Sequence, residues 1–156
     1  MAGKPRRKRP KVDLQVFVEE RDYSAVLPLI DCSQCKFTSF SQLLETIIFL
    51  SQHMYIEEPD DSFVAKLFEL KSARALACLK NKMNSNLRRV HATIDRDALR
   101  FIDMLVSRYR MLFSSRSEVV GLLLGNIGKE CTSLEDIHYY CNRLLEVLLL
   151  HPYRKS

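Results

Sequence analysis

The sequence has no tryptophan, only four glycines and five prolines in 156 residues, and no long apolar run. Glycine and proline end helices and shape turns, so their scarcity beside many leucine, isoleucine and valine residues predicts a mostly helical fold. No run approaches the roughly 20 apolar residues that a membrane-spanning helix needs. The basic N-terminus is not followed by an apolar segment, so we expect no secretory signal and a cytoplasmic protein.

Motifs of common enzyme classes are also missing. There is no glycine-rich phosphate loop of an ATPase, and no paired-histidine metal motif of a DNA-nicking relaxase. The histidines are scattered, at His53, His91, His138 and His151. We therefore expect no enzyme activity, no cofactor and no metal site.

The five cysteines, without a secretory signal, are typical of free thiols in a reducing cytosol. Cys32 and Cys35 form a CxxC pair, for which zinc binding or redox chemistry is the alternative to free thiols. No second such pair provides the remaining zinc ligands, and the other cysteines show no ligand spacing. Free thiols are therefore the better interpretation.

Positive charge is concentrated at one end of the chain. The formal net charge is +5, from 24 basic and 19 acidic residues. Residues 1–11 hold six of the basic residues and no acidic residue. The rest of the chain therefore holds 18 basic and 19 acidic residues, a net charge of −1. We predict that residues 1–11 form a disordered tail, because such a segment repels itself and cannot pack. It is typical of a nucleic-acid-binding arm, with a solubilising terminus or a localisation signal as the alternatives. Its basic residues are Lys4, Arg6, Arg7, Lys8, Arg9 and Lys11.

Two stretches of the chain follow the same order of elements. In residues 14–18 and again in residues 90–94, side chains alternate in a way that predicts two half-buried strands. Each strand is followed by an amphipathic helix, a hydroxyl-rich break and a second apolar helix. A single constant offset, which places Leu14 on Val90, aligns the two stretches without a gap, breaks included. A strand, two helices and a break in register indicate an internal duplication.

The helices between and after these stretches have recognisable starts. In the first copy we predict a helix with Ser24 as its N-cap, so that Pro28 falls in the first turn, where backbone N–H groups lack helical partners. A further helix follows each copy. One is capped by Asp60 or Asp61, and the other begins at the capping box Thr132-Ser133-Leu134-Glu135.

The chain after the tail is thus predicted to be a single domain, residues 12–156, made of two repeats, 12–82 and 87–156. A strand and two helices are too little to bury a core alone. We therefore expect the two strands to pair antiparallel and the helices of both repeats to share one core.

Strand-helix-helix with a hydroxyl-rich entry to the second helix resembles the ribbon-helix-helix DNA-binding family. The resemblance is carried by residues 14–18 and 39–50, and by residues 90–94, 98–106 and 114–124. Most members form this unit by homodimerising, whereas here the dimer is fused, as in relaxosome accessory proteins of the TraY type. The run Leu14-Gln15-Val16-Phe17 is also similar to the first strand of the overdrive-binding proteins of VirC operons. The implied fold is mainly α with one two-stranded antiparallel β-ribbon: two fused units that form a pseudo-dimer, with extra helices.

In this family the ribbon lies in the DNA major groove and its outward side chains read base edges. Since the alternate apolar residues must face the core, the outward residues are Asp13, Gln15, Phe17, Arg89, His91 and Thr93. Arg89 would bind guanine and Gln15 adenine, and Phe17 or Thr93 would contact a thymine methyl group. Asp13 departs from this pattern, because phosphates repel a carboxylate unless it accepts from a cytosine amine. An ordinary solvated sheet face is the alternative for all six.

The resemblance also places the N-terminus of each second helix against a phosphate, which its free N–H groups and dipole would favour. Simple N-capping is the alternative for the hydroxyl groups and is compatible with phosphate binding. The implied residues are Thr38, Ser39, Ser41, Ser114, Ser115, Ser117, Arg116 and Arg88. Residues 87–116 hold seven basic and three acidic residues, against two and five in residues 12–42. We therefore expect the second repeat to bind DNA more tightly and the target site not to be a palindrome.

The implied function is sequence-specific binding of double-stranded DNA, as an accessory factor in conjugative or T-DNA-type DNA transfer. Further partners would be a relaxase or a partition-type ATPase of the transfer system, and other copies of the chain on DNA. A plasmid-type transcriptional repressor of the same fold is the alternative. A helical protein–protein adaptor with a basic tail is the alternative of another class. No membrane partner is expected.

Overall fold

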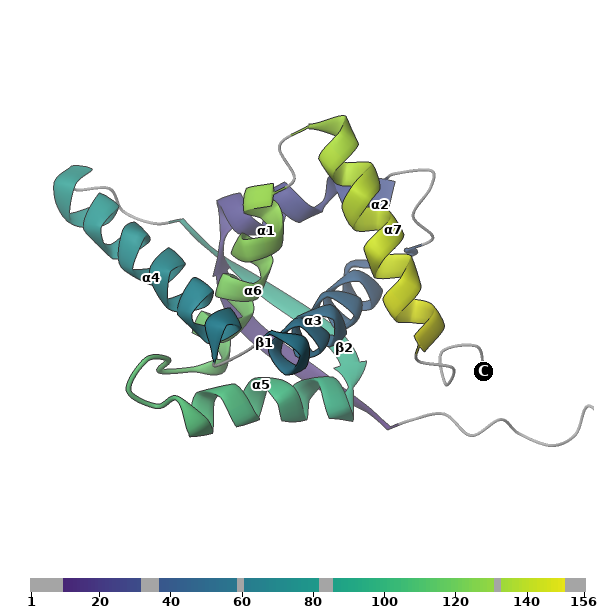
Figure 1. The fold of residues 1–156 in the computed structure, drawn as a ribbon, viewed down its shortest axis with the longest axis horizontal. Helices are drawn as coiled ribbons and strands as arrows, with labels where there is room; N and C mark the ends of the chain where they lie inside the picture. The colour runs from purple at the N-terminus through teal and green to yellow at the C-terminus, as the bar shows by residue number, and fades with distance from the viewer. Residues whose placement is uncertain (1–9, 32–36, 59–60, 82–85, 131–132, 151–156) are drawn as a thin grey trace, which may run out of the picture.

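The computed structural model describes residues 10–31, 37–58, 61–81, 86–130 and 133–150. Within them the chain is mainly helical with one two-stranded antiparallel sheet (Figure 1). The elements are β1 (Lys11–Glu19), α1 (Glu20–Val26), α2 (Pro28–Asp31), α3 (Phe40–Glu57), α4 (Ser62–Asn81), β2 (Leu87–Asp95), α5 (Arg96–Arg108), α6 (Arg116–Glu130) and α7 (Leu134–Leu150). The helical class and the antiparallel pairing of the two predicted strands are confirmed.

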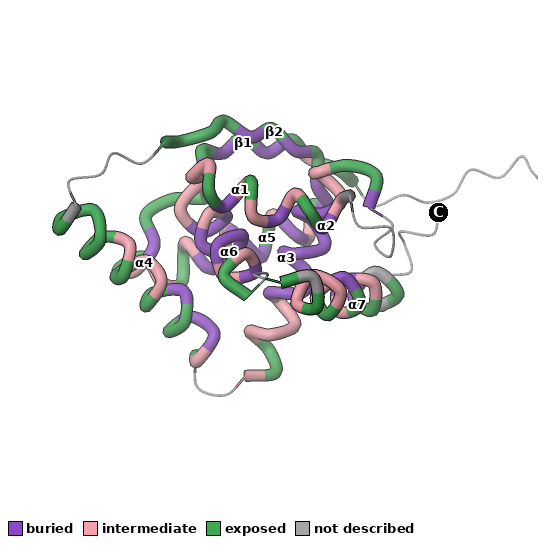
Figure 2. The backbone as a smooth tube through the Cα atoms, turned by 90° about the horizontal axis from the view of Figure 1, so that it is seen from above, coloured by how far each residue is buried: buried purple, intermediate pink, exposed green. Residues whose placement is uncertain are grey.

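The sheet lies along one side of the molecule and the helices lie on the other (Figure 2). β1 contacts α6, and β2 contacts α3, so each strand rests on the apolar helix of the other repeat. Six inward side chains in the middle of the sheet are at most 5 % exposed: Leu14, Val16, Val18, Val90, Ala92 and Ile94. Because α3 and α6 bury residues on most of their circumference, they form the centre of the core.

The strand register is symmetric with respect to the two repeats. Gln15 lies opposite His91, which is its equivalent in the second repeat under the same offset. On one side of this pair Phe17 lies opposite Arg89, and on the other side Asp13 lies opposite Thr93. The pairing is therefore centred on equivalent positions of the two copies.

The first helix differs from the prediction, and Ser24 is not its N-cap. β1 passes directly into α1 at Glu20, whose N–H donates to the Asn86 carbonyl at 2.9 Å and so continues the strand pairing. Ser24 lies inside α1. The helix ends before Pro28, because proline lacks an N–H and its ring would clash with the preceding turn. Pro28 instead takes the first position of α2, where no N–H is needed.

α7 begins one residue later than the predicted capping box would place it. Ser133 Oγ accepts from the Asp136 N–H at 3.1 Å, so Ser133 is the N-cap; Thr132 lies outside the described residues. The buried side chains of α7 are Cys141, Leu144 and Val147, and the helix packs against α3.

α4 packs through only half of its length. Phe63, Val64 and Leu67 are buried, whereas Leu76 and Leu79 are 57 % and 78 % exposed. The last turns of α4 extend away from the body of the molecule (Figure 2). The apolar pattern that predicted this helix is therefore satisfied by the core only in its first half.

A small polar network holds the start of α4. Asp61, with a positive φ of 59°, precedes the helix, and its carbonyl accepts from the Ala65 N–H at 3.0 Å. Asp61 Oδ1 accepts from the Tyr109 hydroxyl at 2.7 Å, and the Tyr109 and Tyr55 hydroxyl oxygens lie 3.0 Å apart. Burial raises the pKa of the Tyr109 hydroxyl above its ordinary value, and these hydrogen bonds raise it further.

Candidate nucleic-acid interface

The outward face of the sheet consists of side chains that are all exposed. These are Asp13, Gln15, Phe17, Arg89, His91 and Thr93. Phe17 is 53 % exposed although it is a large aromatic side chain. The prediction of which residues face outward, made from the alternation, is confirmed. A role of these residues in DNA binding stays a prediction.

Three cross-strand contacts order this face. Arg89 Nη2 donates to Gln15 Oε1 at 2.7 Å. At the other end, Thr93 Oγ1 donates to Asp13 Oδ1 at 3.2 Å, and His91 Nε2 lies 3.5 Å from the same oxygen. Contacts between solvent-exposed side chains contribute little to stability, so each can be exchanged for another partner.

The first turns of α3 and α6 lie beside the two outer edges of the sheet. Ser41 Oγ accepts from the Thr93 N–H at 3.0 Å, and Ser117 Oγ accepts from the Phe17 N–H at 3.0 Å. The two contacts are equivalent under the repeat, because Ser41 aligns with Ser117 and Phe17 aligns with Thr93. Each serine thus binds the strand of the other repeat. This role could not be predicted from the sequence, because a hydroxyl at the start of a helix gives no sign of which strand it will contact.

Ser39 and Ser115 are the N-caps of the two helices, so the N-capping alternative is confirmed for both. Their hydroxyl oxygens accept from the N–H groups three residues later, at 3.2 Å and 3.1 Å. Gln42 Oε1 and Glu118 Oε1 accept in return, each at 2.9 Å, from the N–H groups four residues earlier, which belong to Thr38 and Ser114. Both helix starts are therefore closed by reciprocal capping.

Two N–H groups at each of these helix starts have no partner within the described ranges. They belong to the first two residues of α3 and of α6, that is Phe40 with Ser41 and Arg116 with Ser117. Such N–H groups, at the positive end of a helix dipole, suit an anion.

The two arginines implied in phosphate binding each have an acidic partner. Arg116 Nε and Nη2 donate to the two carboxylate oxygens of Asp103 at 2.7 Å and 3.0 Å. This hydrogen bonding raises the pKa of Arg116, by more than partial burial lowers it. Arg88 Nη1 donates to Glu20 at 3.1 Å, and its guanidinium lies 4.0 Å from the centre of the Tyr23 ring. A phosphate at either arginine has to share it with a carboxylate.

Lys11 belongs to β1 and not to a disordered tail, as the tail prediction had it. The Pro10 carbonyl accepts from the Arg96 N–H at 3.0 Å, so the strand pairing extends to the start of β1. Lys11 Nζ donates to the buried Glu45 carboxylate at 2.7 Å. The other predicted tail residues lie outside the described part of the chain: Lys4, Arg6, Arg7, Lys8 and Arg9.

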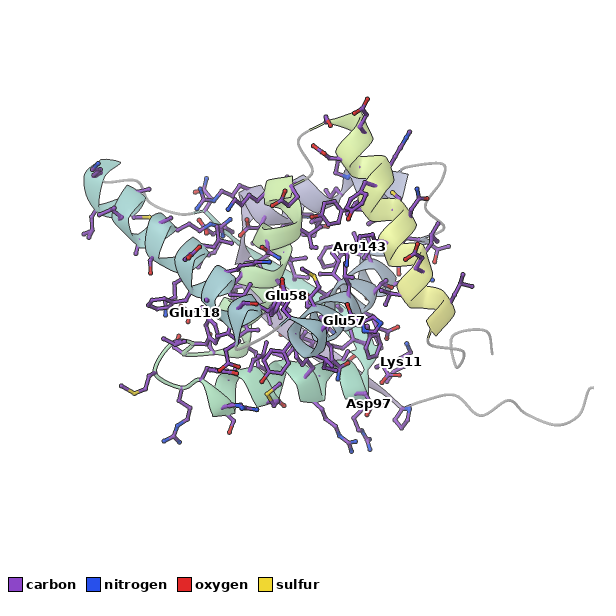
Figure 3. All side chains as sticks on the ribbon, in the orientation of Figure 1. Lys11, Glu57, Glu58, Asp97, Glu118 and Arg143 are labelled. Atoms are coloured by element: carbon purple, nitrogen blue, oxygen red, sulfur yellow. The ribbon has the colours of Figure 1, made fainter. Side chains whose placement is uncertain are left out.

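The equivalent positions Glu45 and Gly121 make the two ends of the sheet different. Glu45 closes the Lys11 end, where its carboxylate also accepts from the Asp95 N–H at 2.6 Å. At the other end Gly121 has no side chain, and a groove of about 240 Å³ opens there beside Phe17 and Glu118. Lys11 and Glu118 are labelled in Figure 3.

Arg74 of α4 forms an ion-pair network next to this groove. Its Nη1 and Nη2 donate to the two carboxylate oxygens of Asp22 at 2.6 Å each, and Nη1 also donates to Glu19 at 3.1 Å. Burial lowers the pKa of Arg74, but the hydrogen bonds and charges of Asp22 and Glu19 raise it by more, so the net shift is upward. This network could not be predicted from the sequence, because hydrophobic periodicity indicates which residues are buried and not which charges pair.

The cysteines do not all follow the free-thiol expectation. Cys78 is a free, exposed thiol. Cys141 is fully buried and disulfide-bonded, whereas Cys32 and Cys35 lie outside the described residues. The expectation is therefore wrong for Cys141, and a stable disulfide is uncommon in a reducing cytosol.

Within the described residues, no three histidine, cysteine or acidic side chains lie close enough together to hold a metal ion. None of the helices in the same ranges is long and apolar enough to cross a membrane.

No family model, curated protein or solved structure matches the chain.

Proposed function

We propose that this chain is a fused, pseudo-dimeric ribbon-helix-helix protein that binds double-stranded DNA sequence-specifically with its sheet in the major groove. The observation that carries the proposal is the register centred on Gln15 and His91, with the Ser41 and Ser117 contacts repeated about that centre. In a symmetric dimer, each contact from one copy to the other occurs twice. Two copies fused in one chain reproduce that pattern.

The exposed face has the properties that base reading requires. A two-stranded ribbon fits the major groove, and the outward side chains include hydrogen-bond donors, acceptors and one apolar ring. The starts of α3 and α6 lie at the two edges of the ribbon, where the phosphates of the two DNA strands would lie. Residues 12–156 hold 18 basic and 19 acidic residues, a net charge of −1, so the basic residues before Pro10 would supply the salt-dependent part of the affinity.

The setting that we propose is accessory DNA binding in conjugative or T-DNA-type transfer, beside a relaxase or a partition-type ATPase. The support is the resemblance of β1 and the fusion of two units. A plasmid-type transcriptional repressor would use the same face of the sheet. Genomic neighbours distinguish the two, since a relaxase gene and an origin of transfer would favour the first.

One observation favours the adaptor alternative: the outer half of α4 exposes Leu76 and Leu79. Exposed apolar side chains on a protruding helix suit a protein partner. An adaptor would bind DNA only through its basic residues and without sequence preference, so DNA selection separates the two functions.

The test is selection of duplexes from a random-core DNA pool by the full chain. We expect one sequence to be enriched, and Arg89→Ala to weaken binding to it about tenfold, the effect of losing one direct base contact. Lys80→Ala, at the exposed end of α4, removes an equal charge far from the ribbon and should leave the preference and affinity unchanged.

Deletion of residues 1–9 should lower affinity for all duplexes alike and keep the preference. It removes five basic residues, Lys4, Arg6, Arg7, Lys8 and Arg9, so the salt dependence of binding should fall by a log–log slope of up to about 4.5. Absence of any enriched sequence, or an enriched sequence whose binding ignores Arg89→Ala, would contradict the proposed function.

A further inference from the structure

The antiparallel register builds each end of the reading face from both repeats. Phe17 of the first repeat lies opposite Arg89 of the second, and Asp13 of the first lies opposite Thr93 of the second. We call these the Arg89 end and the Asp13 end. The more basic second repeat therefore does not form one half of the face by itself, because each end contains residues of both repeats. The face is divided into two composite ends.

The two ends carry opposite charges at equivalent positions. The offset that places Gln15 on His91 also places Asp13 on Arg89, so the repeat relates one to the other. In a symmetric homodimer these two positions would hold the same residue. Here one presents a carboxylate and the other a guanidinium, on either side of the central Gln15 and His91.

The side chains are arranged to present these charges. Arg89 is held on the outward face by its hydrogen bond to Gln15, and its remaining N–H groups are turned to no acidic partner among the described residues. Asp13 accepts from Thr93 and lies near His91, yet its side chain is 74 % exposed. Neither Asp13 nor Arg89 is buried, so both charges can meet a base edge without unfolding the ribbon.

The guanidinium of Arg89 and the carboxylate of Asp13 can bind different base edges. Guanine presents two acceptors, N7 and O6, which match the donors of arginine. A carboxylate has no donor and is repelled by those acceptors. It can accept only from an exocyclic amine, which cytosine and adenine present in the major groove.

We propose that the ribbon reads a directional, non-palindromic DNA site, with guanine at the Arg89 end and an amine-bearing base, cytosine or adenine, at the Asp13 end. The chain then binds its site in one orientation. The proposal rests on the proposed function and specifies the DNA that this face recognises.

Asp13→Arg tests the proposal because it makes the two equivalent positions alike. The full-length wild type, Asp13→Arg, Asp13→Asn and Arg89→Ala are each used to select duplexes from the same random-core pool, and circular dichroism checks that every variant keeps its helical content. The wild type should enrich a non-palindromic site. Asp13→Arg should enrich a site in which the guanine-containing half occurs twice as an inverted repeat, and should bind it about tenfold more tightly than the wild type does.

The smaller variants identify the end that is affected. Asp13→Asn should make adenine the preferred base at the Asp13 end, because asparagine contacts adenine through two hydrogen bonds, and should leave the guanine preference at the Arg89 end unchanged. Arg89→Ala should relax the preference only at the Arg89 end.

The outcomes separate this proposal from the proposed function. A palindromic site for the wild type, or an unchanged site for a folded Asp13→Arg, would overturn the directional reading and leave DNA binding by the ribbon in place. No enriched site with any of the four proteins would instead contradict the proposed function, and this proposal with it.

Discussion

The ion pair between Arg74 and Asp22 should contribute substantially to the stability of the fold. We consider Asp22→Asn, which keeps the shape of the side chain and removes its charge. The Asp22 side chain is only 4 % exposed, and both its oxygens lie 2.6 Å from the Arg74 guanidinium. The substitution therefore leaves the Arg74 charge in a poorly solvated place, with one neutral acceptor at position 22 and Glu19 as its remaining carboxylate partner.

The magnitude follows from burial. Breaking a fully buried ion pair by removing one partner costs about 3–5 kcal/mol. Arg74 is 19 % exposed and keeps Glu19 at 3.1 Å, so it is only partly deprived of solvent and charge. We expect Asp22→Asn to lower the free energy of unfolding by about 2 kcal/mol. Arg74→Met should cost a similar amount, and the double variant should cost about 1–2 kcal/mol less than the two single changes together.

The measurement is urea unfolding followed by circular dichroism, with all variants at the same protein concentration and salt. Arg100→Met is the matched control, because Arg100 pairs with Asp97 at 3.3 Å on the surface, and such pairs contribute at most about 0.5 kcal/mol. An Asp22→Asn protein within about 0.5 kcal/mol of the wild type, or additive costs in the double variant, would refute the reasoning.

Three further predictions follow from contacts described above. Ser41→Ala and Ser117→Ala should each lower the free energy of unfolding by about 1 kcal/mol, because each removes one hydrogen bond to a strand. The two costs, measured by urea titration, should be equal within error, since the contacts are equivalent. Clearly unequal costs would contradict the equivalence of the two edges. Because the folded-state pKa of Tyr109 is raised, its contribution to stability is present below the ordinary pKa of 10.0 and is lost as the pH rises through the folded-state pKa. Tyr109→Phe should therefore lose less stability than the wild type above pH 10.0, and identical pH profiles would contradict this. Reduction should lower the stability of the wild type by about 2–4 kcal/mol and leave that of Cys141→Ser unchanged, whereas Cys78→Ser should behave as the wild type in both states.

The sequence predicts those parts of the fold in which the burial or capping of a residue depends on its near neighbours in the chain. Alternation in residues 14–18 and 90–94 identified the two strands and the face that each buries, because side chains on a strand point to opposite sides in turn. The two hydroxyl-rich breaks located the starts of α3 and α6, because a free N–H group at a helix start prefers a side-chain oxygen nearby. Antiparallel pairing followed from the repeat.

The parts that could not be predicted depend on partners far apart in the sequence. Ser41 and Ser117 were expected only to cap or to bind phosphate, and their contacts with the strand of the other repeat arise from the packing of the two copies. Arg74 lies in an apolar helix pattern that gives no indication of Asp22. The pattern also included Leu76 and Leu79, which would be expected to pack, but no element of the described chain lies there to cover them.

The start of the first helix was misjudged for a local reason. Ser24 is a common N-cap residue, and placing it there made Pro28 acceptable in a first turn. The alternative, a strand that runs into a helix without a side-chain cap, is stabilised by the hydrogen bond from Glu20 to Asn86 across the sheet. That bond exists only once the two repeats have paired.

Equivalent hydrogen bonds close the two extremities of the sheet, but the chain segments that precede these extremities differ. The Pro10 carbonyl accepts from Arg96, and the carbonyl of Asn86, the equivalent position in the second repeat, accepts from Glu20 in the same way. Each carbonyl marks the point where the chain enters a strand. At one extremity the chain arrives from the basic residues that precede Pro10, and at the other it arrives from α4 with its exposed leucines. If the ribbon binds DNA as we propose, the chain would enter β1 at one flank of the site and β2 at the other. Five basic residues precede Pro10 in the sequence, whereas α4 with its exposed Leu76 and Leu79 precedes β2, so the two flanks would offer different surfaces to further copies or partners.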